Sequence, residues 1–136
     1  MRYMIIRKAD AETEAGVIPT REFIEAMTAY NQEMIEAGVM IEGVGLRSSA
    51  EGFRVRVKDR RVTDGPFTET KELIAGFTLI EVSSPEEARA WALKWPAIDA
   101  DAEIEVRRLH DLEDFGDGSI ELIKAQEEQL QQRNNG

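Results

Sequence analysis

The chain has 136 residues, a formal net charge of −10 and no cysteine. This length predicts one domain that buries roughly 65–70% of its unfolded surface. The lack of cysteine excludes disulfides and thiolate metal sites. The negative charge argues against non-specific nucleic-acid binding, because phosphates would be repelled.

The sequence contains no apolar run near the roughly 20 residues that a membrane span needs. Residues 1–8 become charged too early for a signal peptide and predict a first strand instead. We therefore expect a cytoplasmic protein with no membrane partner.

The first half of the chain predicts a strand, a helix and a second strand. Residues 3–6 are a short apolar run, and residues 9–18 are a polar loop. Thr20 is a helix cap, and Gly38 ends the helix. The apolar side of this helix repeats at helical spacing, with Phe23, Met27, Tyr30 and Met34. Residues 39–46 form the second strand.

The second half begins with period-two alternation over residues 53–63, which predicts a hairpin with one apolar and one cationic side. Residues 74–82 predict the next strand. Ser84 then starts a helix as its N-cap, with Pro and Glu at the positions that favour a start. The apolar stripe of that helix is Ala88, Trp91, Ala92 and Trp95, and Pro96 ends it. Residues 103–107 alternate as a last strand.

Two regions follow from this order. Residues 1–110 predict an α+β, ferredoxin-like domain, β-α-β-β-α-β with an inserted hairpin. Residues 111–136 hold seven acidic and two basic side chains, and predict an acidic linker and a C-terminal helix over about residues 119–131. The strands are apolar on both sides, so the second face of the sheet needs cover. We expect a homodimer formed through that face.

Residues 64–77 place a turn, a charged tetrad and the start of a strand in close succession. Asp64-Gly65-Pro66-Phe67, with the following Glu69-Thr70-Lys71-Glu72 and Gly76-Phe77, resembles the DGPF branch of the YCII-related proteins. The opening Met-Arg-Tyr-Met and the late Glu-Val-Arg also fit, so the resemblance covers about residues 1–109.

This resemblance implies a dimeric α/β barrel that is bacterial and cytoplasmic. We expect no cofactor. Some YCII relatives are thought to be enzymes with a histidine–aspartate pair, and one branch is a small lyase acting on a chlorinated aromatic. Some DGPF members are fused to sigma-factor-like domains. Here, residues 9–38 contain no histidine, and Trp95-Pro96-Ala97 stands where relatives often have Asp-Pro-Tyr. Neither member of the pair can be transferred.

Asp64 is the candidate catalytic residue. A carboxylate beside an aromatic ring in a Gly-Pro turn can be partly desolvated, which raises its pKa towards use as a general base. Alternatively, Asp64 accepts backbone N–H bonds within its own turn, and turn chemistry alone explains these residue types.

The candidate ligand contacts are polar groups near the turn and aromatic rings that can reach a cavity. Lys71 can hold an anionic group, and Glu72 can orient Lys71 or Arg107. Glu105 and Arg107 share one face of the last strand and are either a polar anchor in a pocket or a surface ion pair. The aromatic residues, Tyr3 and Phe77 among them, favour core packing, and the alternative is that they reach a cavity between sheet and helix and contact a ligand.

The remaining chemical candidates favour ordinary structural roles. One histidine, His110, cannot make a zinc site, and the acids of the linker lack calcium-loop spacing, so we expect no bound metal. His110 and Asp111 are adjacent and would point opposite ways on an extended chain. The cationic side of the hairpin predicts a solvated surface or one that meets acids of the other subunit.

The leading functional hypothesis is a small-molecule binding or accessory homodimer with a cleft near the Asp64 turn. The first alternative is a cofactor-independent lyase or isomerase that uses Asp64 as base on a small acid. The second is a transcription-associated interaction module.

Overall fold

The computed structural model describes residues 1–135. Six strands and four α-helices follow the order β1 (Arg2–Lys8), α1 (Ala11–Glu14), α2 (Arg21–Glu36), β2 (Met40–Gly45), β3 (Phe53–Arg56), β4 (Arg61–Asp64), β5 (Ile74–Glu81), α3 (Pro85–Ala92), β6 (Ile104–Arg108) and α4 (Asp117–Asn135). The protein is therefore an α+β protein, as predicted. No helix in this part of the chain is long and apolar enough to cross a membrane.

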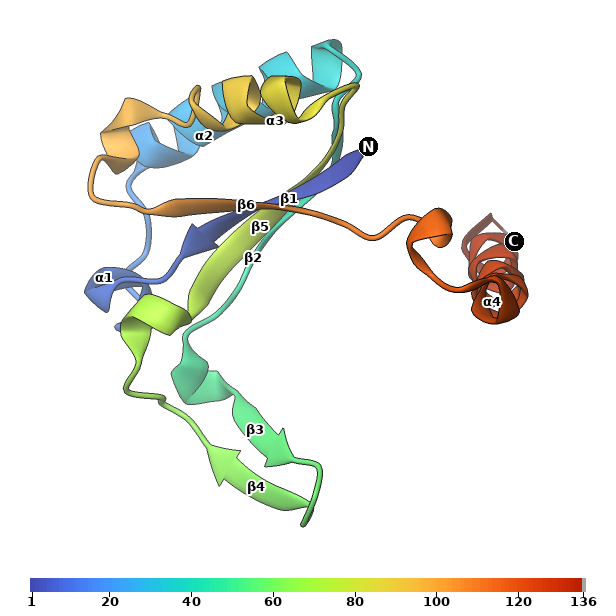
Figure 1. Ribbon diagram of the computed structural model, residues 1–136. Coiled ribbons are helices and arrows are strands. Elements are labelled where there is room, and N and C mark those ends of the chain that lie inside the picture. Colours follow the sequence, from blue (N-terminus) through green and yellow to red (C-terminus); the bar gives the residue numbers. More distant parts are fainter. Residues whose placement is uncertain (136) are drawn as a thin grey trace.

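The main sheet has four strands in the order β2-β5-β1-β6, and each neighbouring pair is antiparallel. Helices α2 and α3 lie together over one face of this sheet (Figure 1). The two β-α-β units thus interleave, which is consistent with the split arrangement that the sequence predicts. Within the described residues, no helix lies over the other face of the sheet (Figure 1).

The core lies between the sheet and the two helices. It contains Tyr3, Ile5, Tyr30, Met34, Val39, Ile80, Val82 and Ala88. Strand alternation explains the set, because Tyr3 and Ile5 of β1 pair with Ile80 and Thr78 of β5 and point to the helix side. Both predicted helix stripes contribute to it.

The predicted helix starts are confirmed by their caps. The side chain of Thr20 accepts a hydrogen bond from the backbone N–H of Phe23, and that of Ser84 accepts one from Glu87. Gly38 follows α2 with a φ of +70°, a conformation that favours glycine. Helix α3 ends at Ala92, four residues before Pro96, where the sequence predicted its end.

Two helical segments differ from the sequence prediction. A short helix, α1, lies in the stretch predicted as a loop, where Asp10 and Thr13 form a reciprocal capping box. Helix α4 begins at Asp117 and extends to Asn135, so it is longer at both ends than predicted. It stands apart from the body at the end of an extended segment (Figure 1).

The predicted hairpin is present as a separate two-stranded sheet of β3 and β4 that projects from the body (Figure 1). Its base is fixed at Gly65, where a Cβ atom would lie 1.7 Å from the carbonyl oxygen of Ser49. Only glycine fits there, and its N–H donates to the carbonyl of Gly52 at 2.9 Å. The Gly65–Pro66 peptide bond is cis.

Tyr30 links the two helices, and this contact predicts a pH effect. Its hydroxyl donates to the carbonyl of Trp91 at 2.8 Å, and burial raises the pKa of Tyr30 to about 12 from an ordinary 10.0. The neutral form is favoured in the folded state, so this stabilisation is complete below pH 10 and lost as pH rises towards 12. Tyr30→Phe should cost about 1 kcal/mol at pH 8. Urea titrations should show that the difference in free energy of unfolding between the wild type and Tyr30→Phe disappears by about pH 12. A difference that does not change with pH would contradict this role of Tyr30.

Candidate functional site

Asp64 lies at the base of the hairpin and is exposed to solvent. It pairs with Phe53 across the hairpin, so it shares the apolar side of β3 and β4. Among residues 1–135 its carboxylate accepts no hydrogen bond and makes no ion pair. The turn is therefore not held by Asp64 capping its own backbone.

The turn is held instead by residues distant in sequence. The backbone N–H of Phe67 donates to Oγ of Ser49 at 3.0 Å, and the hydroxyl of Ser49 donates to the carboxylate of Glu14. The same carboxylate accepts the N–H of Ser49 at 3.1 Å. This network joins the Asp64 turn to the end of α1. The sequence analysis did not predict this network. The signal available for it was the capping pattern of Asp10 and Thr13, which predicts α1 and so places Glu14 at the end of a helix.

Arg54 covers the aromatic residue of the same turn. Its guanidinium carbon lies 3.8 Å from the centre of the Phe67 ring, and its Nη1 lies 3.5 Å from a carboxylate oxygen of Glu69. A cation held over a ring face is a favourable arrangement. Phe67 and Glu69 therefore have partners within the chain, whereas the side chain of Asp64 has none among residues 1–135.

The open face of the sheet, on the side away from α2 and α3, is apolar at its centre. Met4 and Ile6 point there because they alternate with the buried Tyr3 and Ile5. The register places Leu79 beside Met4 and Phe77 beside Ile6, and it brings Val44 beside Phe77. Met4, Phe77 and Leu79 are only partly covered within one chain.

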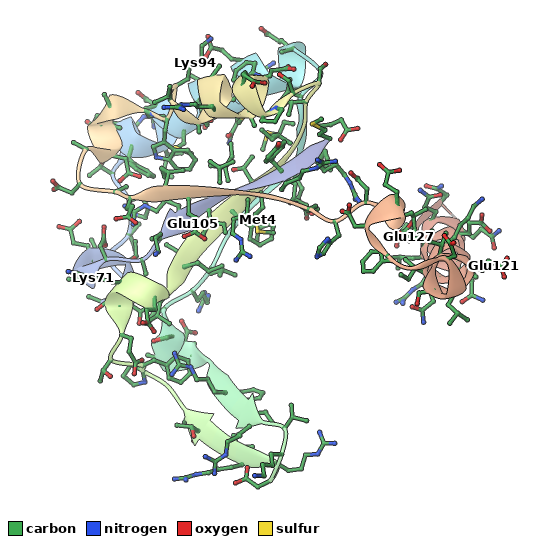
Figure 2. All side chains as sticks on the ribbon, viewed as in Figure 1. Met4, Lys71, Lys94, Glu105, Glu121 and Glu127 are labelled. Carbon is green, nitrogen blue, oxygen red and sulfur yellow. The ribbon has the colours of Figure 1, made fainter. Side chains whose placement is uncertain are left out.

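Charged side chains border this face on β6. Glu105 pairs with Ile6 and Arg107 pairs with Met4, so both lie on the open face. Figure 2 labels Glu105 and Met4. Lys8 Nζ lies 4.0 Å from carboxylate oxygens of both Glu103 and Glu105. Ion pairs this long and exposed stabilise little.

The other predicted contacts are more scattered. Lys71 and Glu72 lie in a 3-10 helix just before β5 and are exposed, at the end of the sheet where β1 finishes (Figure 2). Tyr3 lies on the helix side, in the core. The structure thus brings Phe77, Glu105 and Arg107 to one face, with Lys71 and Glu72 at its end, and it places Asp64 on the hairpin and Tyr3 behind the sheet.

A comparison with protein families matches the YCII-related domain over residues 1–113. This chain belongs to the YCII-related family. No curated protein matches the sequence. Among solved structures, a similar one is the 5-chloro-2-hydroxyhydroquinone dehydrochlorinase of Burkholderia phenoliruptrix in complex with 2,5-dihydroxybenzoquinone. It shares 16% identity and a TM-score of 0.44, over 81% of this chain and 94% of the enzyme.

A second polar cluster in this YCII-related protein lies on the helix side of the sheet. Arg7 donates from Nε and Nη2 to the two carboxylate oxygens of Asp99 at 3.1 and 2.7 Å, and Trp95 Nε1 donates to Asp99 at 3.0 Å. The bond to Asp99 raises the pKa of Arg7, and Asp10 adds a further ion pair at 3.1 Å. The pKa of Asp10 is lowered, chiefly by the hydrogen bond that its carboxylate accepts from the Thr13 N–H and further by the charge of Arg7. Four of the five N–H donors of Arg7 are used within the chain, since its Nη1 also donates to the carbonyl of Lys8, so this cluster is a structural clamp.

His110 and two of the acids after β6, Asp111 and Asp114, also have internal partners. His110 Nδ1 lies 3.3 Å from Asp114, one helical turn further on, and not beside Asp111. Within residues 1–135 no group of three histidine, cysteine or acidic residues could hold a metal ion.

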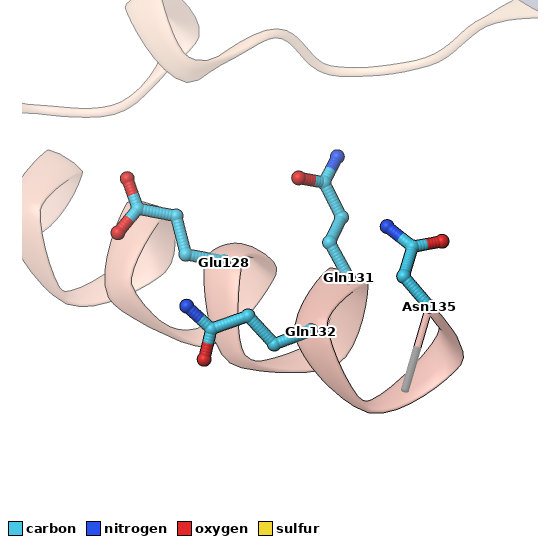
Figure 3. Close-up of a pocket in the computed structure, with 4 residues that line it drawn as sticks. All are labelled: Glu128, Gln131, Gln132 and Asn135. Carbon is cyan, nitrogen blue, oxygen red and sulfur yellow. The ribbon is translucent and has the colours of Figure 1, made fainter.

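Two surface hollows of this YCII-related protein lie away from the predicted contacts. One follows α4 and is lined by Glu128, Gln131, Gln132 and Asn135 (Figure 3). The other lies on the outer side of α2, between Arg21 and Gln32. Each is formed by one helix, and neither contains a residue of the predicted site.

Proposed function

We propose that this YCII-related protein binds a small molecule as a homodimer, in a cleft between two sheets near the Asp64 turn. The observation that supports the proposal is the apolar open face described above. Membership of the YCII-related family supports it as well. A contiguous apolar patch with a charged border is typical of an interaction surface.

The proposed dimer follows from the energetics of that face. Met4, Phe77 and Leu79 stay partly in water in one chain, and burying apolar surface stabilises by roughly 25 cal/mol per Å². A second copy offers the same apolar centre about a two-fold axis. Two sheets that pack this way exclude water from their centres and leave charged side chains at the rim.

The proposed ligand is a small acid with an apolar or aromatic body. Phe77 offers a ring for the body, and the planar guanidinium of Arg107 can bind a carboxylate through two hydrogen bonds. Lys71 and Glu105 lie at the edge of the face, and Asp64 and Glu72 are further polar contacts in this proposal. Neither a lyase reaction with Asp64 as base nor a transcription-associated role has a supporting contact within residues 1–135.

Benzoate, which combines a ring with a carboxylate, tests the ligand class. In protein labelled at its methionine methyl groups, benzoate should shift the NMR signal of Met4 and leave that of Met34, which is fully buried on the other side. Arg107→Met should weaken binding at least about tenfold, because a hydrogen bond to a charged group contributes about 1.5–3 kcal/mol.

Arg89→Met is the matched control, since this exposed arginine lies on α3, on the opposite side of the sheet. It should leave the benzoate affinity unchanged. Equal effects of the two substitutions, or a benzoate titration that moves no methyl signal, would count against the proposed cleft.

Leu79→Arg tests the sheet contact. Placing a charge at the centre of the open face should raise the dimer dissociation constant about 100-fold or more, since burying one leucine contributes about 1.5–3 kcal/mol and an unpaired charge adds to the loss. Leu93→Arg is the control, because Leu93 is 78% exposed beside α3. Sedimentation velocity should show a monomer only for the first variant, and two dimeric variants would refute the sheet contact.

A further inference from the structure

We propose that the hairpin of β3 and β4 packs against helix α4 of a second copy of this chain, so that the homodimer exchanges its two projecting arms. This inference rests on the homodimer proposed above. It concerns a second surface, distinct from the open face of the sheet, and it gives the C-terminal helix a role.

The hairpin has an unpartnered apolar side. Val55 and Val62 pair directly across the two strands, so their side chains share one face with Phe53. Phe53 is 65% exposed and Val62 is 58% exposed. Two strands alone cannot cover such residues, and a hairpin of this kind is marginally stable without a packing partner.

Helix α4 also exposes apolar side chains. Leu122 is 73% exposed and Leu130 is 56% exposed, and no residue of the helix is buried. At 100° per residue these two leucines and Ile123 fall within about 100° of the helix circumference. They form one side of a helix that stands apart from the body of its own chain (Figure 1).

The charges of the two arms are opposite. Residues 53–64 hold five basic and two acidic side chains, a net charge of +3, whereas α4 holds four acidic and two basic ones, a net charge of −2. Within the hairpin Arg56 lies directly opposite Arg61, a pairing that is unfavourable unless acids lie nearby. Asp59 pairs with Arg56. The ribbon is two strands wide, so long arginine side chains can reach past its edges. Glu127, labelled on α4 in Figure 2, falls about 40° from Ile123 around the helix and is the acid that such an arginine would meet.

Both arms are fixed in position by contacts at their bases, and this favours a second copy over the same chain. The N–H of Leu109 donates to the carbonyl of Arg2 at 2.9 Å, and Arg108 pairs with Asp111 at 2.7 Å, so the segment leading to α4 is braced against the sheet. The hairpin is braced by the bonds of Gly65 and Phe67 described above. The arms project in different directions (Figure 1). Because the arms point away from each other and their bases are held, a partner chain is the source that we infer for the missing contact.

The lack of cysteine permits a direct test by disulfide trapping. Val62→Cys in the hairpin and Leu122→Cys in α4 are made in separate full-length chains that carry different tags, and the two are mixed and mildly oxidised. A disulfide should join one chain of each kind. Lys94→Cys, at an exposed position just after α3, is the control partner for Leu122→Cys and should react several-fold less.

Sedimentation of the unmodified protein separates this inference from the proposed function. A dimer with a strong Val62–Leu122 cross-link supports the exchange of arms. A dimer in which Val62 reacts no better than Lys94 overturns the exchange and leaves the sheet dimer intact. A further variant carries Val62→Cys and Leu122→Cys in the same chain. If its disulfide forms only within single chains, the contact belongs to one chain and the exchange is overturned. A monomer overturns both proposals.

Discussion

Gly65→Ala is expected to lower the free energy of unfolding by about 3 kcal/mol, because the added methyl would overlap backbone that cannot rotate away. The Cβ atom would lie 1.7 Å from the carbonyl oxygen of Ser49 and 3.3 Å from that of Gly52. Both strands entering the hairpin would have to separate, and the N–H bond from Gly65 to Gly52 would break. Urea unfolding followed by tryptophan fluorescence and by circular dichroism measures the change.

Gly52→Ala is the matched control in the same junction. The nearest atom to its added Cβ would be 3.6 Å away, an ordinary contact, and its φ of −120° suits any residue. This variant should stay within about 0.5 kcal/mol of the wild type. Similar midpoints for the two variants would show that the close approach at Gly65 does not set the stability of the turn.

Asp99→Ala is expected to cost about 3 kcal/mol, because it leaves the guanidinium of Arg7 without its main partner in a largely buried position. The Arg7 side chain is 13% exposed and that of Asp99 is 9% exposed. The substitution also removes the acceptor of the Trp95 indole N–H. Thermal and urea unfolding both measure the loss.

An exposed ion pair provides the comparison for Asp99. Arg21 and Glu25 are bonded at 2.8 Å on the surface of α2, with side chains 88% and 63% exposed. Glu25→Ala should cost about 0.5 kcal/mol or less. If Asp99→Ala were as mild as Glu25→Ala, the cluster of Arg7, Asp99 and Trp95 would not be a clamp.

Most of the fold could be predicted because its signals are local. Thr20 and Ser84 cap their helices through bonds to residues three positions on, and alternation marks the hairpin over residues 53–63. Such patterns depend on neighbours in the sequence. Helix α1 was missed because it has only four residues, which are too few to show helical spacing of apolar residues. Its cap, Asp10, was the only local signal.

The surroundings of the candidate site could not be predicted in the same way. The Asp64 turn is fixed by Glu14 and Ser49, and the clamp joins Arg7 to Asp99, more than 90 positions apart. No local sequence pattern indicates contacts between residues so far apart in the chain. Alternation did place Glu105 and Arg107 on one face, but it did not show that Tyr3 lies behind the sheet, since that depends on which side α2 and α3 cover.

Sedimentation equilibrium of the wild-type chain at micromolar concentration tests the central claim, that the open face of the sheet is covered by a second copy. The wild type should have the mass of two chains of 15.3 kDa each, and the Leu79→Arg variant should have the mass of one chain. A folded wild-type protein with the mass of a single chain would contradict it.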